Sequence, residues 1–189
     1  MGKNDIAASS GRQRLILETP RLFLRQFAPE DADALARVIS DAETMRYYPA
    51  PFDRAGVEEW IKRNRRRYQR DGHGLWAMVL KSSGEMIGDC GLVRQQIDGV
   101  DEVEIGYHVR RDLWGQGLAS EAACACRDYG FSHLPVDQLI SLIRPENLWS
   151  RRVAVKNGMH LWKETLRMGF LHYVYRVVRP GLPGVTRES

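Results

Sequence analysis

Long apolar runs are missing from this chain of 189 residues. A membrane-spanning helix needs about 20 consecutive apolar residues, and no segment approaches that length. Residues 1–13 are polar and rich in small side chains, without the apolar core of a secretion signal. We therefore expect a cytoplasmic protein with no membrane anchor. Its parts would be a flexible leader over 1–13, one domain over 14–179 and a flexible tail over 180–189.

Cysteine is scarce as well. The three thiols, Cys90, Cys124 and Cys126, form neither an even set nor a disulfide framework. Cys124 and Cys126 stand two apart on a predicted helix, so their side chains point in different directions. A metal site would need more ligands than the neighbouring sequence supplies. We expect reduced thiols and no bound metal.

Positive charge is only mildly in excess, at +4, but basic residues gather in one predicted helix. They are Lys62, Arg63, Arg65, Arg66, Arg67 and Arg70. They spread around most of the helix, which is typical of a solvated helix whose arginine stems cover apolar surface. An acidic substrate, RNA and the phosphates of a cofactor are the alternatives. Nucleic acid would be favoured by exposed aromatic residues interleaved over a wider area, and this pattern is absent.

The most informative segment is Arg110–Ala122. An extended apolar stretch before it runs into two glycines, Gly115 and Gly117, and a helix-forming sequence follows. A strand, glycine turn and helix in this order direct free backbone N–H groups and a helix dipole at one point, which suits a phosphate. Without Cβ atoms, the glycines let an anion approach the main chain. A flexible turn is the plainer interpretation.

Two common phosphate-binding loops do not fit this segment. The loop of nucleoside triphosphatases ends in Gly-Lys-Ser/Thr, whereas Leu118 and Ala119 follow Gly117 here. The dinucleotide-binding fingerprint needs a third glycine where this chain has Ser120. The segment therefore predicts a loop that holds a pyrophosphate through its backbone alone.

The apolar patterns along the chain predict more strands than helices. Antiparallel hairpins precede one strand–helix–strand crossover, so we expect an α+β domain with a mixed, mostly antiparallel sheet and about four helices. The predicted strands cover 21–27, 75–80, 86–93, 102–109, 139–143, 161–165 and 170–178. The predicted helices begin near Ala28 and cover 57–69, 118–129 and 148–156.

Four blocks of sequence resemble the GNAT superfamily of acyl-CoA-dependent N-acyltransferases, and within it the ribosomal-protein N-terminal (Rim-type) acetyltransferases. These blocks are Glu18–Arg25, Glu104–Tyr107, Trp114–Ala122 and Asn147–Met159. The resemblance implies a sheet splayed into a V that parts between the strands at 102–109 and 139–143. The pantetheine arm of acetyl-CoA would lie in the gap, and the acceptor amine would enter from the other side.

The resemblance also implies which residues contact acetyl-CoA. The strand end at 107–109 would meet the pantetheine through its backbone, and an N–H near Val109 would stabilise the oxyanion. The loop would meet the pyrophosphate, and two residues of the fourth helix match positions that often contact the cofactor. The cofactor-binding residues so implied are Tyr107, His108, Val109, Leu113, Trp114, Gly115, Gln116, Gly117, Leu118, Ala119, Asn147 and Ser150.

An amine must lose a proton before it attacks a thioester. Glu104, on the strand that leads to the loop, is the candidate proton acceptor, through water, and Glu102 is its substitute. A surface or salt-bridged carboxylate is the plainer interpretation. Many relatives protonate the departing thiolate with a tyrosine on the fourth helix, but Ala154 stands there. Ser141, Tyr173 and Tyr175 are the candidates to replace it, and a structural role is the alternative for each.

We therefore expect an enzyme that transfers an acetyl group from acetyl-CoA to a primary amine by direct attack in a ternary complex. The acceptor would be a peptide N-terminus, a polyamine or antibiotic amine, or an amino acid, and the protein would be a monomer or homodimer. The alternative, motivated by Ala154, is a non-catalytic acyl-CoA-binding sensor or interaction module. RNA binding through the arginine-rich helix is the third hypothesis.

Overall fold

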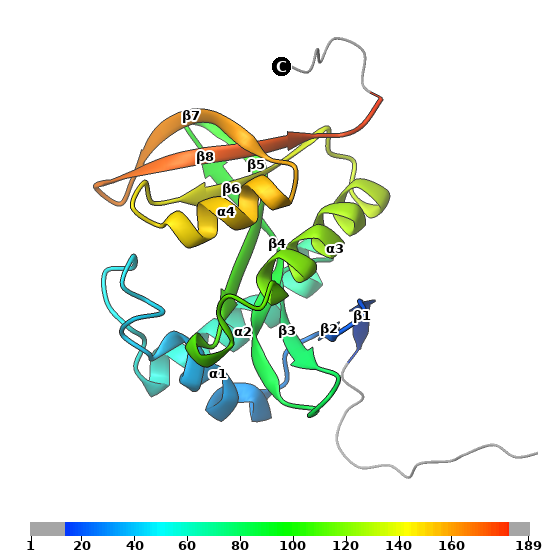
Figure 1. Cartoon of the computed structure of the whole chain (residues 1–189), viewed down its shortest axis with the longest axis vertical. Coiled ribbons are helices and arrows are strands. Elements are labelled where there is room, and N and C mark those ends of the chain that lie inside the picture. Colours follow the sequence, from blue (N-terminus) through cyan, green and yellow to red (C-terminus); the bar gives the residue numbers. More distant parts are fainter. Residues whose placement is uncertain (1–13, 182–189) are drawn as a thin grey trace, which may run out of the picture.

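The computed structural model describes residues 14–181 (Figure 1). The strands are β1 (Leu15–Glu18), β2 (Leu22–Arg25), β3 (Leu75–Leu80), β4 (Met86–Ile97), β5 (Val100–Val109), β6 (Gln138–Ile143), β7 (His160–Arg167) and β8 (Phe170–Val178). The helices are α1 (Ala32–Ile39), α2 (Arg54–Asp71), α3 (Leu118–His133) and α4 (Leu148–Lys156), with 3-10 turns η1 (Pro29–Asp31) and η2 (Arg111–Leu113). The predicted leader 1–13 and residues 182–189 of the predicted tail lie outside the described residues. Between residues 14 and 181, no helix is long and apolar enough to cross a membrane.

The strands form one sheet in the order β1-β2-β3-β4-β5-β6-β8-β7. Neighbouring strands are antiparallel except β5 and β6, which are parallel. These two strands share one register pair, Glu104 with Ile140, whereas β4 and β5 pair along the whole of β5. The sheet therefore opens between the second half of β5 and β6, and the predicted mixed, splayed sheet is confirmed.

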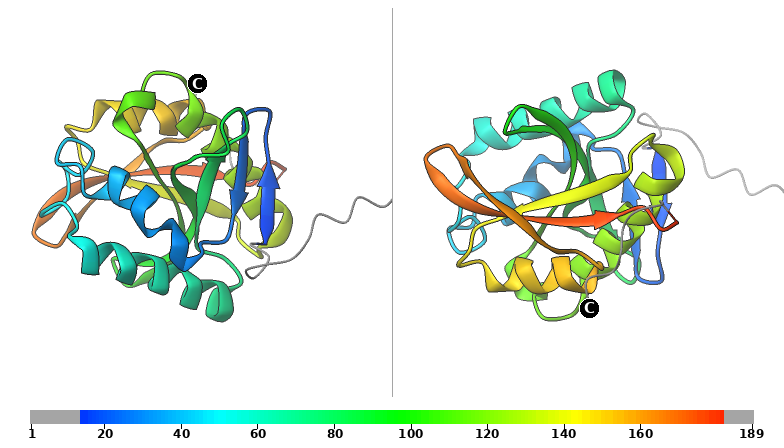
Figure 2. Two further views of the ribbon diagram at one scale, coloured as in Figure 1. Left: turned by 90° about the horizontal axis from the view of Figure 1, so that it is seen from below. Right: turned by 90° about the horizontal axis from the view of Figure 1, so that it is seen from above.

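Helices cover both faces of the sheet (Figure 2). Helices α1 and α2 pack on one face, where Leu35, Val38 and Ile39 form an apolar stripe along α1 and are completely buried. Helices α3 and α4 pack on the opposite face, where Ala122 and Ala154 are buried. Burying one large aliphatic side chain stabilises a fold by roughly 1.5–3 kcal/mol. These two apolar layers hold the edges of the opening in place.

The element boundaries differ from the predicted ones in two instructive places. Helix α2 begins at Arg54 rather than 57 because the Asp53 side chain caps it, accepting a hydrogen bond from the Gly56 amide at 2.8 Å. Strand β1 was not predicted at all. It is four residues long, its side chains are exposed or half-buried, and it lies at the edge of the sheet, so it carries little apolar pattern.

Candidate active site

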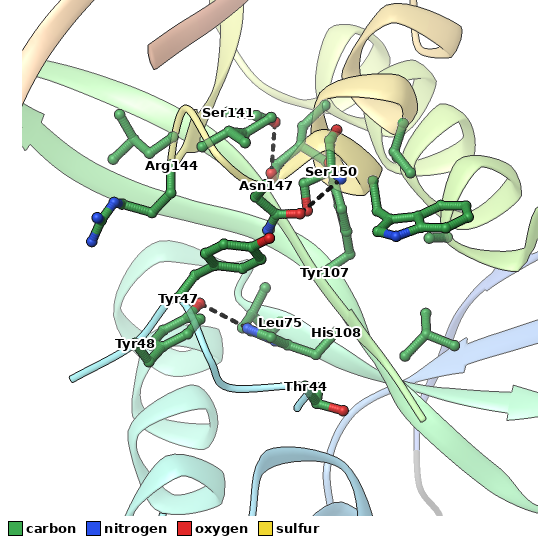
Figure 3. A pocket seen from close by; sticks show the side chains of 18 of the residues that line it. Thr44, Tyr47, Tyr48, Leu75, Tyr107, His108, Ser141, Arg144, Asn147 and Ser150 are labelled. Carbon is green, nitrogen blue, oxygen red and sulfur yellow. Dashed lines mark hydrogen bonds between the residues drawn. The ribbon is translucent and has the colours of Figure 1, made fainter. Parts of the chain in front are cut away.

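A cavity of about 1010 Å3 lies where the sheet opens (Figure 3). Its walls come from β5, β6, the loop 43–53, α2, the segment 113–120, α4 and the turn between β7 and β8. Gln116 and Tyr175, two of the predicted site residues, are not in its lining, and neither are Glu102 and Tyr173, which were predicted as alternatives. All the other predicted catalytic and cofactor-binding residues line this one space.

The free edge of β5 presents backbone groups to the cavity. Bonded and non-bonded pairs alternate in an antiparallel ladder, and the Arg110 amide donates to a β4 carbonyl at 2.8 Å. By this alternation, the His108 backbone bonds to β4, whereas the Tyr107 and Val109 amides point into the gap. The Val109 carbonyl accepts a bond from the Trp114 indole at 2.7 Å. The Tyr107 and Val109 amides are therefore placed to donate to an extended ligand.

The glycine loop next to this edge offers a row of free amides. Gly115 and Gly117 both have φ of +78°, a conformation that costs residues with a side chain about 1–2 kcal/mol. Helix α3 begins at Leu118 without a side-chain cap. Within residues 14–181, no amide from 115 to 120 donates a hydrogen bond. Free N–H groups at a helix N-terminus bind anions, so the loop fits a pyrophosphate.

Glu121, in the first turn of α3, connects the glycine loop to the turn between β1 and β2. Its carboxylate accepts bonds from Thr19 Oγ1 at 2.6 Å and from the Arg21 amide and Nε at 2.8 and 2.6 Å. Arg21 Nη1 also donates to the Gln116 carbonyl at 2.9 Å. The first and third blocks of the resemblance thus meet in space, and Gln116 is held by its carbonyl rather than facing the cavity.

Helix α4 closes the cavity on the side opposite the β5 edge. Asn147 caps it, with the side-chain oxygen accepting a bond from the Ser150 amide at 3.1 Å. The Tyr107 hydroxyl donates to the Ser150 carbonyl at 2.9 Å. These bonds fix the start of α4 against β5, so Asn147 and Ser150 line the space opposite the β5 edge (Figure 3).

Glu104 lies at the point where β5 and β6 separate. Its Oε2 accepts a bond from Gln95 Nε2 at 2.7 Å, and its Oε1 lies 3.4 Å from the Leu142 amide. Burial raises the pKa of Glu104, and the Gln95 bond and the charge of Arg167 oppose this rise. Glu102, its predicted substitute, bonds to Gln138 at 2.7 Å and is not in the cavity lining.

A hydrogen-bonded chain on the α2 side of the cavity was not predicted from the sequence. His108 Nδ1 lies 2.7 Å from Asp89 Oδ1, and Asp89 is completely buried. The other Asp89 oxygen accepts a bond from Trp60 Nε1 at 2.8 Å. His108 Nε2 lies 2.7 Å from the Tyr48 hydroxyl (Figure 3). No sequence spacing relates residues 48, 60, 89 and 108: the β4–β5 register pairs Asp89 with His108, and the packing of α2 and the loop 43–53 adds the other two.

The hydroxyl groups of Ser141 and Tyr175 both form hydrogen bonds within the protein. The Ser141 hydroxyl is buried and donates to the Ile105 carbonyl at 2.8 Å. This bond links β6 to β5 next to the point where the two strands separate. The Tyr175 hydroxyl accepts a bond from Arg151 Nε at 3.0 Å, away from the cavity lining. Ser141 therefore lies in the cavity wall with its proton engaged, and Tyr175 lies behind the wall.

The cysteines form no metal site with their neighbours. Cys90 and Cys126 are buried with their sulfur atoms 3.5 Å apart, and Cys124 is half-buried. Among residues 14–181, no three His, Cys, Asp or Glu side chains gather in a way that could hold a metal ion.

Residues 21–160 match the family model of the acetyltransferase (GNAT) domain. The chain belongs to the GNAT acetyltransferase family. Its glycine loop, splayed β5–β6 pair and α4 all fall within the matched residues.

Curated relatives carry the same likeness along most of the chain. An uncharacterised Bacillus subtilis protein, YkkB, is 40% identical over 152 residues, which cover 80% of this chain and 88% of YkkB. An uncharacterised Bacillus licheniformis N-acetyltransferase, p20, is 34% identical over 153 residues, covering 79% and 84%.

Solved structures share the fold. An acetyltransferase from Agrobacterium tumefaciens superposes with a TM-score of 0.74 at 27% identity, covering 94% of this chain and all of its own. RimJ from Mycobacterium smegmatis, in complex with a CoA disulfide, superposes with a TM-score of 0.67 at 23% identity, covering 86% and 84%. At that identity, RimJ supports the fold alone.

Proposed function

We propose that this protein transfers an acetyl group from acetyl-CoA to a primary amine by direct attack in a ternary complex. The observation that carries the proposal is the single cavity joining the free β5 edge to the unbonded amides of the glycine loop. Tyr107 and Val109 would hold the pantetheine through their amides, and the loop 113–119 would hold the pyrophosphate. Membership of the GNAT family supports both assignments.

Glu104 would accept the proton of the incoming ammonium, directly or through water. A carboxylate is a better base when its pKa is raised toward the working pH, and burial raises the pKa of Glu104. The charge that develops on the acetyl oxygen would be stabilised by the Val109 amide, which points into the gap. Holding amine and thioester together removes the need for a covalent enzyme intermediate.

The thiolate would leave with limited help from acids. A thiol pKa near 8.5 allows departure without strict protonation. Ser141 would have to break its hydrogen bond to the Ile105 carbonyl before it could donate a proton to the thiolate. Tyr175 lies behind the cavity wall and could reach the thiolate only through other groups. The finer assignment to the Rim-type subgroup, with a peptide N-terminus as acceptor, is part of the proposal and rests on the four sequence blocks.

Thiol release from acetyl-CoA, measured against N-terminal peptides, amino acids, polyamines and aminoglycosides, tests this function. Glu104→Gln should lower turnover by about 100-fold or more while CoA binding, measured by calorimetry, stays unchanged. Glu102→Gln is the matched control, since it removes a carboxylate two residues away that lies outside the cavity lining. Unchanged turnover in Glu104→Gln would remove the role assigned to Glu104.

The alternative of a non-catalytic acyl-CoA sensor rests on Ala154, which is 1% exposed where many relatives carry a tyrosine. Tight CoA binding with no thiol release from any amine would favour the sensor. Release with even one amine above the rate of hydrolysis would exclude it.

A further inference from the structure

Three arginine side chains without a carboxylate partner line the cavity in the region of Glu104, the proposed proton acceptor, and we call this region the acceptor side. Arg63 and Arg67 project from α2, and Arg167 ends β7. Arg63 stacks over the Trp60 ring at 4.8 Å, Arg67 donates to Asn64 Oδ1 at 3.2 Å, and Arg167 donates to Gln95 Oε1 at 2.8 Å. Within the described part of the chain, no carboxylate oxygen lies within 4.0 Å of these three guanidinium groups.

Three other arginines of α2 form ion pairs with carboxylates. Arg54 pairs with Asp33 and Glu58, Arg66 with Glu59, and Arg70 with Asp71. All three of these arginines lie outside the cavity lining. The guanidinium groups of Arg54, Arg66 and Arg70 thus have a carboxylate beside them, whereas those of Arg63, Arg67 and the exposed Arg65 have none among the described residues, and of these last three only Arg63 and Arg67 line the cavity. Burial, and after it the neighbouring charges of Arg63 and Arg70, lower the pKa of Arg67, while the charges of Glu104 and Asp71 oppose this lowering.

The acidic residues in the same wall do not balance the charge. Glu43 is paired with Arg46, and Asp53 caps α2. Glu104 bonds to Gln95, which in turn accepts the bond from Arg167, so one amide links the proposed proton acceptor to a guanidinium. The acceptor side therefore carries surplus positive charge around a single carboxylate that the reaction itself needs.

We propose that the acceptor is an amine that also carries an anionic group, a carboxylate or a phosphate, and that Arg63, Arg67 and Arg167 bind this group. The guanidinium fork matches both anions bidentately. This inference rests on the proposed acetyl transfer and narrows its substrate class. Polyamines and aminoglycosides would be repelled because they add positive charge to the site. The same surplus charge lowers the pKa of a bound ammonium and favours the free amine that attacks.

The cofactor's phosphates are a poorer match for these arginines. The free amides of 115–120 lie at the start of α3, whereas Arg63 and Arg67 belong to α2, and the two helices cover opposite faces of the sheet (Figure 2). A ligand held by the loop and threaded through the gap would bring its reactive end, not its phosphates, toward α2.

Acceptor pairs that differ only in charge test the inference. Suitable pairs are aspartate with asparagine, phosphoethanolamine with ethanolamine, and N-terminal peptides with Asp-Glu or Asn-Gln after the first residue. For at least one pair we expect kcat/KM about 10-fold or more higher for the anionic member, as expected for one charge-assisted contact. The pair that responds identifies the source of the anion. Added salt should reduce the preference.

In Arg67→Gln combined with Arg167→Gln, the preference should fall to within about threefold, while the KM for acetyl-CoA stays unchanged. Arg65→Gln is the matched control, because Arg65 is exposed on the same helix and outside this cavity. Arg67→Lys keeps the charge and should retain part of the preference, which guards against misfolding of the double variant.

Equal turnover of both members of every pair would overturn the inference and leave acetyl transfer standing. A rise in the KM for acetyl-CoA in the arginine variants, with acceptor preference intact, would also overturn it by assigning the arginines to the cofactor. No thiol release from any amine, with CoA still bound, would refute the proposed function and this inference with it.

Discussion

Glu121→Gln would test how the turn between β1 and β2 holds the glycine loop. The carboxylate accepts three bonds, from Thr19 Oγ1 at 2.6 Å and from Arg21 N and Nε at 2.8 and 2.6 Å. A glutamine keeps one oxygen as an acceptor for the first two donors. Its NH2 group, however, faces Arg21 Nε, so that two donors oppose each other and the charge-assisted bond is lost.

The expected cost follows from that geometry. A lost bond to a charged group costs about 1.5–3 kcal/mol, but the Arg21 side chain is 47% exposed and water recovers part of it. We expect the free energy of unfolding to fall by about 1.5 kcal/mol and Tm by roughly 3–6 °C. Because Arg21 also holds the Gln116 carbonyl, the KM for acetyl-CoA should rise as well.

The effect should depend on pH with a definite sign. Burial alone would raise the pKa of Glu121, but the bonds from Thr19 and Arg21 outweigh it and hold the pKa below the ordinary value of 4.5. A carboxylate with a lowered pKa stabilises the fold fully above the unfolded-state pKa. This contribution is lost as the pH falls below 4.5 through the folded-state value. The difference between the wild type and Glu121→Gln should therefore shrink in acid.

Urea unfolding at pH 7 and at several values below 4.5 would measure this difference. Asp128→Asn is the matched control, since it removes a carboxylate that is 66% exposed on the same helix. An equal loss of stability in both variants, or a difference that stays constant as the pH falls, would refute the role assigned to Glu121.

Three further substitutions, the last of them a control, test the packing of β4 and of the turn before it. Asp89→Asn should cost about 2 kcal/mol in urea unfolding, because the two carboxylate oxygens face His108 Nδ1 and the Trp60 indole separately and the amide NH2 of asparagine would replace one of them; an unchanged free energy of unfolding would contradict this. Gly91→Ala should cost about 3 kcal/mol in urea unfolding, since the new Cβ would lie 2.1 Å from the Gly74 carbonyl oxygen. Gly84→Ala, with no atom within 4 Å of the new Cβ, should cost only about 1 kcal/mol for its left-handed backbone, and equal losses in both would contradict the contact.

Local sequence predicted the elements that carry strong patterns. Strand β3 and helix α4 both end where predicted, at Leu80 and Lys156, because the signals that define them are local to the chain. The half-exposed residues of β1 carry no such signal, and that strand forms only by pairing with β2. The predicted site residues gather well for the same reason, since most of them belong to one strand and the loop after it.

The sequence by itself determined the strand, glycine loop and helix that offer free amides to an anion, because these features depend on neighbours in the chain. The tertiary structure decided which charged side chains line the cavity. Asp89 meets His108 only through the β4–β5 register, and Arg67 and Arg167 reach one cavity only because α2 and the end of β7 lie on either side of it. Periodicity tells which side of an element is apolar, but it does not tell which distant side chain will oppose it. Pairing across the sheet and packing of the helices on it supply that information, and with it the charge of the cavity wall.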